Sequence, residues 1–486
     1  MEKYDSFKEN LKKGAEKFLN IPKKETIRII GHLDADGICA SSIIINALTK
    51  LNRKYTLTIL PTITDESLEQ LKSENEKYFV FVDLGSGSLD SIGRILSEKN
   101  IFILDHHHPQ STTIYNNITQ INPHLFNIDG SDEISGAGVV FLFTQELVDN
   151  SEMSRIAIVG AIGDIQENNG FKKLNSEILN IAINKRLIEV KKGLKFFGVQ
   201  TKPIHKLLQY SSEIIIPDVT GSESGAIKFL QQIGINPQTK KGWKKISELT
   251  DDEKKRLIAA IVMKSNNSKP EDIFTNNYLL IGEKEDSPFR DAKEFATLLN
   301  SCGRLNKASI GIGACLNDPK MKKMAIENLT QYRREIVNAL NWYKDNEHSD
   351  KIFRKKNILI INAEEEVLPT MIGTLGSILS KSQDIEKNTF ILSLARNYDN
   401  TTKVSLRISG KPENINLKDV IQKIIEESGN GSSGGHAFAS GAVISTDYEE
   451  RFIESALKVL SEFNFELIND SIKEDMNNKT VINEQL

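Results

Sequence analysis

The segment Thr26-Ile27-Arg28-Ile29-Ile30-Gly31-His32-Leu33-Asp34-Ala35-Asp36-Gly37 joins a short apolar run to one imidazole and two carboxylates. Its first part, Thr26–Ile30, has the composition of a buried β-strand. On an extended segment, side chains two residues apart point to the same side. His32, Asp34 and Asp36 are therefore expected to face one region of space at the end of a strand.

Further strands are expected along the N-terminal part of the chain, at Tyr55–Leu60, Tyr78–Val82 and Asn100–Leu104. Segments of helical period separate them, at Ile38–Leu51, Ser67–Glu76 and Leu89–Glu98. Two of the strands are almost unbroken Ile, Val and Phe, which is typical of strands that are buried on both faces. Alternating strands and helices predict an α/β fold with a doubly wound parallel sheet.

Acidic residues and histidines follow these apolar segments. Asp83 follows one strand, Asp105-His106-His107-His108 follows the next, and Asp164 comes after the apolar segment Ile156–Ile162, which we take as a further strand end. Each group alone could be a solvated loop or a helix cap. Because the carboxyl ends of parallel strands share one edge, where ligand crevices form, their recurrence favours a single site.

Carboxylates crowded into one crevice raise one another's pKa unless cations neutralise them. Mixed oxygen and imidazole ligands favour Mn²⁺ and also suit Mg²⁺. Two such ions about 3.5–4 Å apart activate water for attack on phosphorus. We therefore expect two divalent metal ions as cofactors.

The chain has 486 residues, a formal net charge of −4, eight His and three Cys. At about 150 residues per domain, this length predicts roughly three domains. Cys39, Cys302 and Cys315 form no disulfide framework and no Cys-x-x-Cys pair, so they are expected to be buried apolar side chains in a reducing compartment. The near-neutral charge excludes a broad basic coat, so any nucleic acid must bind at a local site.

No stretch approaches the roughly 18 apolar residues of a membrane span, and Met1–Asn20 is charged throughout, unlike a signal peptide. We expect a cytoplasmic protein with no membrane association. Within Met1–Asn20, one apolar face predicts an amphipathic helix, formed by Phe7, Leu11, Ala15 and Phe18.

Five parts are expected along the chain: residues 1–200, a middle region 201–318, a long connecting helix 319–350, a second α/β domain 351–470 and a polar tail 471–486. The second α/β domain has expected strands at Asn357–Ile361, Thr389–Leu394 and Val404–Ile408. A glycine-rich loop, Gly429–Gly441, precedes its final helix.

His32-x-Asp34-x-Asp36, the lone Asp83, Asp105-His106-His107 and Asp164 resemble, in order and spacing, the four motifs of the DHH phosphoesterase superfamily. The segment Gly434–Gly441 is similar to the glycine-rich signature of the DHH-associated C-terminal domain, although Ser433 replaces its first glycine and Ser440 stands where another small residue is expected. Asp291–Arg304 further resembles archaeal RecJ-like nucleases, including those associated with the GINS replication complex. The resemblance implies a DHH catalytic domain, a middle insertion and a DHH-associated substrate-binding domain.

The resemblance also implies roles for the motif residues. His32 and Asp34 would hold one metal ion, and Asp36, His106 and Asp164 the other, with Asp83 as the bridge. Asp105 would orient a neighbouring histidine or join the metal shell. His107 would face the scissile phosphate and act on its oxygens or on the leaving group. His108 is left outside the ligand set.

Substrate contacts are expected in the C-terminal domain. Gly434 and Gly435 would let backbone N–H groups approach an anion and His436 could donate to it, unless this loop is an ordinary surface turn. Arg407 alternates away from apolar neighbours on its strand, as a phosphate ligand or a simple exposed arginine would. Arg304 is a further candidate, with capping of its helix as the alternative.

Three functions are open. The first is a Mn²⁺- or Mg²⁺-dependent exonuclease that releases nucleoside monophosphates from single-stranded DNA or RNA, in DNA replication or repair. The second is a small-substrate phosphoesterase, such as an oligoribonuclease, a cyclic-dinucleotide hydrolase or a pyrophosphatase. The third is a replication scaffold that binds GINS or the replicative helicase complex. The middle region favours a polymer substrate, and the intact motifs argue against a scaffold without activity.

Overall fold

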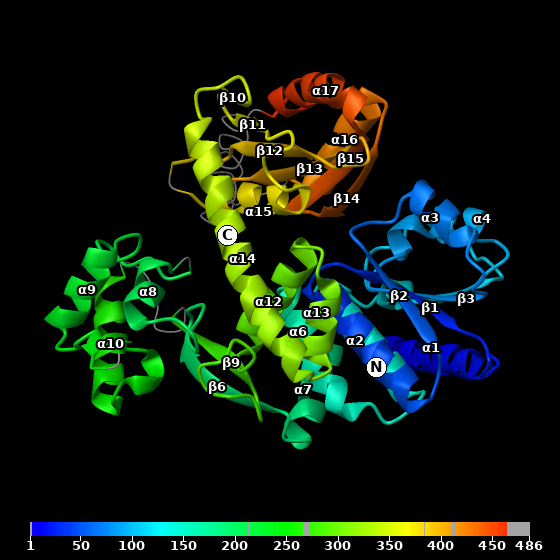
Figure 1. Ribbon diagram of the computed structural model, residues 1–486, viewed down its shortest axis with the longest axis horizontal. Helices are drawn as coiled ribbons and strands as arrows, with labels where there is room; N and C mark the ends of the chain where they lie inside the picture. The colour runs from blue at the N-terminus through cyan, green and yellow to red at the C-terminus, as the bar shows by residue number, and fades with distance from the viewer. Residues whose placement is uncertain are drawn as a thin grey trace, which may run out of the picture. The chain divides into compact units, whose positions relative to one another are not determined.

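The computed structural model describes residues 2–463, except residues 169, 212, 241, 266–272, 383, 411 and 413–414 (Figure 1). The chain divides into two compact units, Met1–Leu329 (unit 1) and Thr330–Leu486 (unit 2). This division falls inside the long helix expected from the sequence. The other domain boundaries stay predictions, and the tail 471–486 lies outside the described residues.

Unit 1 contains a five-stranded sheet with the order β2-β1-β3-β4-β5. All neighbouring strands are parallel, which confirms the expected fold class. The strands are β1 (Ile27–His32), β2 (Tyr55–Leu60), β3 (Tyr78–Val82), β4 (Asn100–Leu104) and β5 (Ile118–Ile121). The short strand β5 was not predicted. The strand order reverses between β1 and β3, where a doubly wound sheet opens its ligand crevice.

Helices cover both faces of this sheet, as the alternating pattern predicts. On one face, α3 (Asp65–Lys72) and α4 (Leu89–Ile95) share an apolar core with β3 and β4. On the other, α2 (Ala35–Lys50) and α5 (Gly136–Gln145) pack on the strands and on each other. Helix α7 (Lys173–Asn184) packs behind α5.

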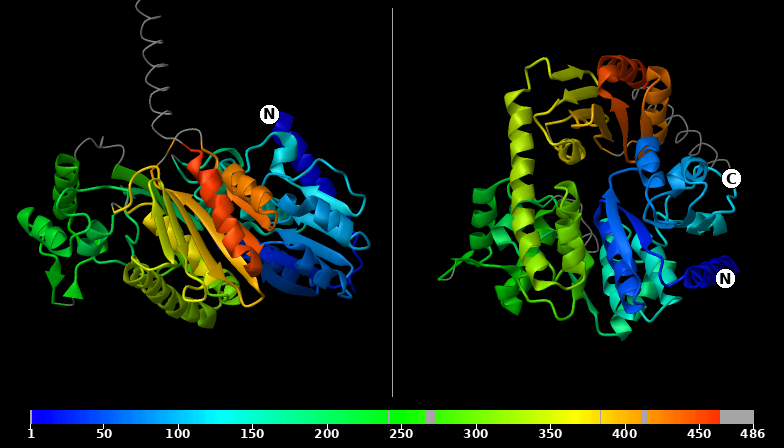
Figure 2. Two further views of the ribbon diagram at one scale, coloured as in Figure 1. Left: turned by 90° about the horizontal axis from the view of Figure 1, so that it is seen from above. Right: turned by 45° about the vertical axis from the view of Figure 1, so that its right-hand side comes forward.

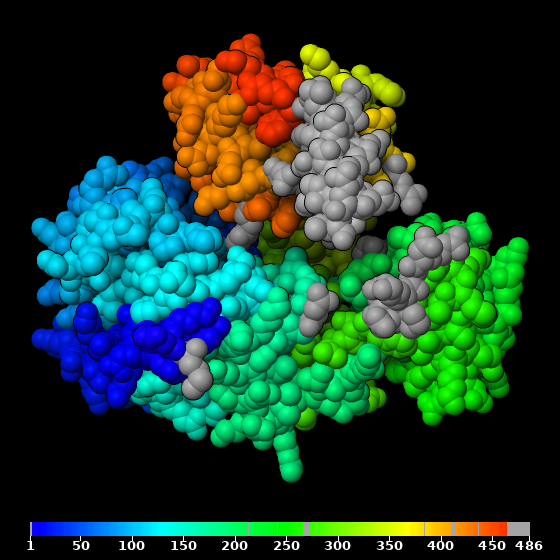
Figure 3. Space-filling view, turned by 180° about the vertical axis from the view of Figure 1, so that it is seen from behind, coloured from blue at the N-terminus to red at the C-terminus, as the bar shows by residue number. Residues whose placement is uncertain are grey.

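The N-terminal helix α1 (Glu2–Leu19) buries the apolar face expected from the sequence. The ring of Phe18 lies 5.3 Å from that of Phe102 on β4 and 5.8 Å from that of Phe143 on α5. Figure 3 shows this helix, in blue, lying against the cyan part of unit 1. Burial of such a phenylalanine contributes about 1.5–3 kcal/mol to stability.

The apolar segment before Asp164 is a helix, and the strand expected there is wrong. Ser154–Gly163 forms α6, which packs against α2, α5 and α12. Every residue from Ile156 to Ile162 is buried. A short helix that is apolar all round has no polar stripe, so its period cannot be distinguished from that of a buried strand.

The middle region is a helical lobe within unit 1. Its helices α8 (Ile204–Gln209), α9 (Glu223–Gln232) and α10 (Asp251–Lys264) enclose an apolar core of their own. The antiparallel ribbon of β6 (Ile188–Leu194) and β9 (Phe274–Leu280) flanks the lobe in the chain, and the short pair β7 (Gln238–Thr239) and β8 (Gly242–Trp243) lies within it.

After the lobe, α12 (Ala292–Arg304) and α13 (Ala308–Cys315) pack against α2. The long helix α14 (Pro319–Asp345) follows, close to the range expected from the sequence. The three cysteines are buried, as expected. Among the described residues, no helix combines the length and the apolar character that a membrane crossing requires.

Unit 2 contains a six-stranded mixed sheet with the order β10-β11-β12-β13-β15-β14. The strands are β10 (Ile352–Lys355), β11 (Ile358–Asn362), β12 (Phe390–Arg396), β13 (Thr401–Ile408), β14 (Ser432–His436) and β15 (Ala439–Ser445). One apolar core joins the sheet to α16 (Leu417–Ser428) and α17 (Glu449–Ser461), and a second joins it to α14 and α15 (Pro369–Leu379). Figure 2 shows α16 and α17 side by side on this sheet.

The glycine-rich segment of unit 2 is a β-hairpin, where the sequence predicts a loop. Strands β14 and β15 pair antiparallel, with Gly434 opposite Gly441 and Gly435 opposite Ser440. The low strand propensity of glycine hides this pairing in the sequence, and the neighbouring strand β13 supplies the missing context.

Candidate metal centre

The segment after β1 turns into helix α2 and carries the first three candidate ligands. His32 is the last residue of the strand, and Asp34 is the N-cap of α2, where its side chain accepts a 2.9 Å hydrogen bond from Gly37 N. Asp36 lies in the first turn of the helix and is buried. Aspartate is favoured at an N-cap because it satisfies an open backbone donor.

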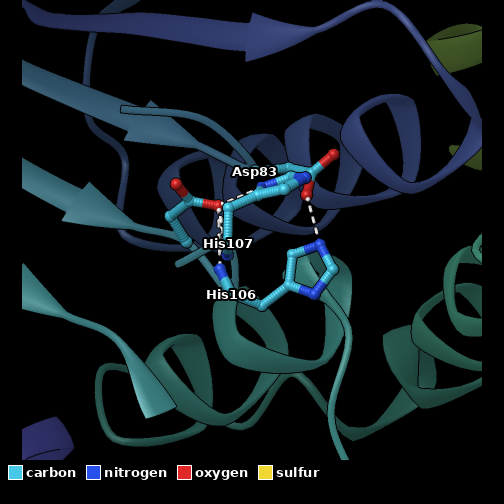
Figure 4. Close-up of side chains that lie close together, drawn as sticks. Asp83, His106 and His107 are labelled. Atoms are coloured by element: carbon cyan, nitrogen blue, oxygen red, sulfur yellow. Dashed lines mark hydrogen bonds and ion pairs between the residues drawn. The ribbon is translucent and has the colours of Figure 1, made fainter. Parts of the chain in front are cut away.

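Asp83 follows β3 and lies between two histidines. Its Oδ2 is 3.3 Å from His32 Nδ1. Its Oδ1 is 3.3 Å from His106 Nε2, and Figure 4 shows these two side chains facing each other. The backbone of Asp83 has a φ of 60°, a left-handed conformation that Asp and Asn tolerate better than most residues. Among the described residues, its buried Oδ1 has no hydrogen-bond partner of good geometry. A buried carboxylate oxygen without a well-aligned hydrogen-bond donor is costly unless a cation binds it.

Asp105 is fully buried after β4 and fixes the two histidines that follow it. Its Oδ1 accepts hydrogen bonds from His107 Nδ1 at 2.7 Å and from the backbone N of His106 at 2.8 Å. Its Oδ2 accepts one from Ser86 N at 2.9 Å. His106 Nδ1 lies 2.7 Å from the carbonyl oxygen of Gly130, so we assign this nitrogen as the donor and Nε2 as the atom that faces the cluster.

The N-terminus of α5 binds Asp36. Gly136 N donates to Asp36 Oδ2 at 2.7 Å, and Ala137 N donates to Asp36 Oδ1 at 3.1 Å. A side chain at Gly136 would not fit, because its Cβ would lie 2.2 Å from Asp83 Oδ1. These helix-terminal N–H groups therefore hold a carboxylate of the cluster.

Potential ligand atoms gather in three overlapping groups, with all atoms of a group within 4.8 Å of one another. The groups are His32, Asp34 and Asp83; Asp36, His106 and Asp164; and Asp83, Asp105, His106 and His107. The first group contains the ligands expected for one ion together with the expected bridge, Asp83, and the second contains the three ligands expected for the other ion. That these residues bind metal stays a prediction.

The electrostatics of the cluster fit cations. Burial, and next the charge of Asp83, raise the pKa of Asp36 well above its usual value. Burial alone would lower the pKa of His32 and of His106, but the carboxylates around them raise both values well above normal. Without metal, the cluster therefore retains protons that reduce its negative charge, and divalent cations can take their place.

An amide side chain that the sequence did not single out holds Asp164, and a second amide holds the first. Gln166 is buried, and its Nε2 donates to Asp164 Oδ2 at 2.8 Å and to the carbonyl of Gly130 at 2.9 Å. Asn175 Nδ2 donates to Gln166 Oε1 at 2.7 Å. Ile165, between Asp164 and Gln166, has a φ of 61°, which is strained for a β-branched residue. Because Gly130 also accepts from His106, one amide couples two candidate ligands.

Helix α12, which is far from the first motif in the sequence, contacts the loop of that motif and holds it in place. Asn300 Oδ1 accepts a 2.9 Å hydrogen bond from Ala35 N, between Asp34 and Asp36. The backbones approach so closely that a Cβ at Gly303 would lie 1.7 Å from the carbonyl oxygen of Leu33. These contacts fix the position of the loop that contains Asp34 and Asp36.

The expected substrate residues lie apart from this cluster in the chain. Arg304 is the half-buried last residue of α12 in unit 1. Arg407 lies on β13 of unit 2, where its Nε donates to Ser377 Oγ at 2.9 Å and its Nη1 to the carbonyl of Ser440 at 3.0 Å. Gly434 and Gly435 are exposed on β14, the strand that also contains His436.

His108 lies outside these groups. Its ring stacks on that of His124, with centroids 3.7 Å apart. The structure therefore brings together eight of the expected site residues and leaves the third histidine of the run outside, in agreement with the expectation.

Family models match three parts of the chain. They are the DHH family N-terminal domain at residues 26–163, the DHH-CID domain at 196–272 and the DHHA1 domain at 359–464. The uncharacterized protein MJ0831 of Methanocaldococcus jannaschii is 33% identical over 467 residues, which cover 95% of this chain and 99% of that protein. This chain belongs to the DHH family and is RecJ-like.

Solved structures share the fold at low sequence identity. RecJ of Thermus thermophilus in complex with Mn²⁺ matches with a TM-score of 0.57 and 15% identity over 94% of this chain, which spans 55% of that chain. An exonuclease RecJ bound to manganese matches with a TM-score of 0.55 and 16% sequence identity. The match covers 94% of this chain and 95% of that chain. CDC45 of Entamoeba histolytica matches with a TM-score of 0.62 and 12% sequence identity. The match covers 93% of this chain and 99% of that chain.

We predict that Asp83→Asn abolishes stabilisation by Mn²⁺. In the wild type, an ion at a hundredfold excess over its Kd adds about 2.7 kcal/mol of stability, which thermal melting with and without EDTA detects. The variant should show little Mn²⁺ response, because a neutral amide replaces the carboxylate expected to bridge the two ions. Asp5→Asn, at an exposed position of α1, is the control. An undiminished Mn²⁺ response in Asp83→Asn contradicts the assignment.

We also predict that Gln166→Ala weakens Mn²⁺ binding by about 10- to 100-fold, because Asp164 and the Gly130 carbonyl lose a shared donor. Isothermal titration calorimetry measures this affinity directly. Gln231→Ala, at an exposed position of α9, provides the matched control. Equal affinities for both variants would show that Gln166 does not position the site.

Proposed function

We propose that this protein is a metal-dependent exonuclease that releases nucleoside monophosphates from single-stranded DNA or RNA, in DNA replication or repair. As a member of the DHH family with the RecJ-like fold, it is a hydrolase of phosphoester bonds. The observation that carries the proposal is the complete set of carboxylates and imidazoles, gathered within ligand distance in unit 1. A scaffold without activity has no use for such a costly cluster of buried charges.

His32 and Asp34 would hold one divalent ion, Asp36, His106 and Asp164 a second, and Asp83 both. Oxygen and imidazole donors favour Mn²⁺, with Mg²⁺ as the alternative. Solved RecJ structures of the same fold contain Mn²⁺ or Mg²⁺. When bound, two such ions would neutralise phosphate charge and lower the pKa of a nucleophilic water.

His107 would act on the phosphate directly. Its Nδ1 donates to Asp105, and its Nε2 would contact a substrate oxygen or the leaving group. Its side chain is 32% exposed, whereas that of His106 is 3% exposed. Burial alone would lower the pKa of His107, but Asp105 raises it, so the protonated form persists to higher pH. Asp105 is thus the positioning residue for the proton donor.

Arg407, Gly434, Gly435 and His436 of unit 2 would hold a phosphate of the strand, with Arg304 of unit 1 as a further contact. Strand β14 ends the order of strands in its sheet. On an edge strand, alternate N–H groups point away from the ladder. Gly434 and Gly435 have no side chains to keep an anion from such groups.

A second proposal is that the protein also binds a replication partner such as GINS or the replicative helicase complex. The fold match to CDC45 over 93% of the chain supports it. A small-substrate phosphoesterase is the alternative to the exonuclease, because the same ligand set would serve it.

The exonuclease proposal predicts Mn²⁺-dependent release of nucleoside monophosphates from one end of an oligonucleotide. The test incubates the protein with single-stranded DNA or RNA labelled at the 5′ or the 3′ end and resolves the products over time. EDTA and Asp83→Asn should each abolish release. Hydrolysis of a dinucleotide or pyrophosphate without cleavage of any oligonucleotide would establish the small-substrate alternative.

His107→Ala is predicted to lower kcat by about 10²- to 10⁴-fold, the usual contribution of a general acid. Mn²⁺ affinity, measured by calorimetry, should stay within about twofold of the wild-type value. His108→Ala is the matched control, because its ring stacks on His124 outside the cluster. If His107→Ala instead loses Mn²⁺ affinity in proportion to activity, His107 is a metal ligand.

A further inference from the structure

Unit 1 has a small, partly open cleft next to the loop that contains Asp164. The end of α6, the segment after β6, strand β9 and the start of α12 line it. Ile162 and Glu167, on either side of Asp164 in the chain, form part of its wall. Glu167 Oε2 is buried there and has no hydrogen-bond partner among the described residues. The cleft therefore begins at the edge of the candidate metal centre.

Two ammonium groups in the cleft share one carboxylate. Lys195 and Lys293 both line it. The carboxylate of Glu213 lies 3.1 Å from Lys195 Nζ and 3.2 Å from Lys293 Nζ. Lys293 Nζ also lies 3.6 Å from Glu167 Oε1. The two lysines thus already bind carboxylates, which a phosphate could replace.

Aromatic rings and lysines continue from the cleft onto the middle lobe. Phe197 lines the cleft, and Lys202 Nζ lies 4.7 Å from the centre of its ring and 6.0 Å from that of Tyr210. Lys206 Nζ lies 5.5 Å from the Tyr210 ring. Tyr210 is 62% exposed although it is a large aromatic residue. We call Phe197, Lys202, Lys206 and Tyr210 the aromatic–lysine track.

The track is built on a rigid base. Helix α8 buries Ile204, Leu207 and Leu208 in the core of the lobe, and Tyr210 caps the end of this helix. The turn before Lys202 is held by α12, because buried Glu294 accepts a hydrogen bond from Gln200 N at 2.9 Å. Ordered rings lose little entropy when a ligand stacks on them.

We propose that the cleft and the aromatic–lysine track bind single-stranded nucleic acid, with bases stacked on Phe197 and Tyr210 and phosphates paired with Lys202 and Lys206. This inference rests on the proposed exonuclease function. Aromatic faces interleaved with ammonium groups are the usual platform for single strands of any sequence. Phe197 belongs to both the track and the cleft, and the cleft reaches the residues around Asp164. A strand with its end at the metal centre would continue along this surface.

The charges that face the track allow this exchange of partners. Lys206 Nζ pairs with Glu223 Oε2 at 2.7 Å on the surface of the lobe. An exposed ion pair of this kind is weak, so a phosphate can replace the carboxylate. A protein partner that covers the same surface is a different class of ligand, and the experiment below separates the two.

The test measures binding of fluorescein-labelled oligothymidylate, 20 nucleotides long, by fluorescence anisotropy in Mn²⁺ buffer. All proteins are full-length and carry Asp83→Asn so that the strand is not cleaved. Adding Tyr210→Ala should weaken binding by about 5- to 100-fold, the loss expected for one base–aromatic stack. Tyr210→Phe keeps the ring and should bind within about twofold of the parent. Tyr398→Ala, at a fully exposed tyrosine of unit 2, is the matched control.

Equal affinity of the parent and Tyr210→Ala for the 20-mer overturns the inference, and so does an equal loss in Tyr398→Ala. Lys202→Ala combined with Lys206→Ala provides a second measurement, and an unchanged salt dependence of binding in that variant counts against the track. The proposed function fails separately, if the wild-type protein with Mn²⁺ cleaves no oligonucleotide. If the wild type cleaves oligonucleotides but the parent and the Tyr210→Ala variant bind the 20-mer with equal affinity, only the aromatic–lysine track is overturned.

Discussion

Repulsion between buried carboxylates is the constraint on which unit 1 depends. Asp36, Asp83 and Asp105 are each at most 2% exposed, and the first two approach within ligand distance of the same histidine. Such a cluster is stable only if N–H donors, protons or cations balance its charge. The N-terminus of α5 binds Asp36, the backbone after β4 binds Asp105, and Asp83 is left with an oxygen that a metal ion would satisfy.

The same constraint explains why distant parts of the chain form one folding unit. The loop between β1 and α2 is completed by α12, whose Asn300 binds Ala35 across 265 positions of sequence. The helical lobe lies between these two segments in the chain, so it is an insertion into unit 1. This arrangement places the lobe, with its aromatic rings and lysines, next to the loop that contains Asp164.

A net charge of −4 and single-stranded nucleic acid as substrate are compatible in this structure. The cluster in unit 1 would become positive at its surface when two divalent ions bind. The two lysines of the aromatic–lysine track lie over rings, and Lys206 also pairs with Glu223. Affinity for a strand would then come from stacking and a few local phosphate contacts, with less from a broad basic surface.

From the sequence, the four strands β1 to β4 and the acidic groups that follow three of them were predictable, because buried strands have short apolar runs and parallel strands end at one edge. The helical state of α6, the hairpin of β14 and β15, and the roles of Gln166 and Asn300 were not. Helix α6 is buried on every side, so its sequence has no polar–apolar period that distinguishes a helix from a strand. The hairpin of β14 and β15 is rich in glycine, which has low strand propensity. The amides of Gln166 and Asn300 acquire their roles only from the partners that folding brings to them. Local patterns therefore identified the candidate ligands, and long-range packing decided what holds them in place.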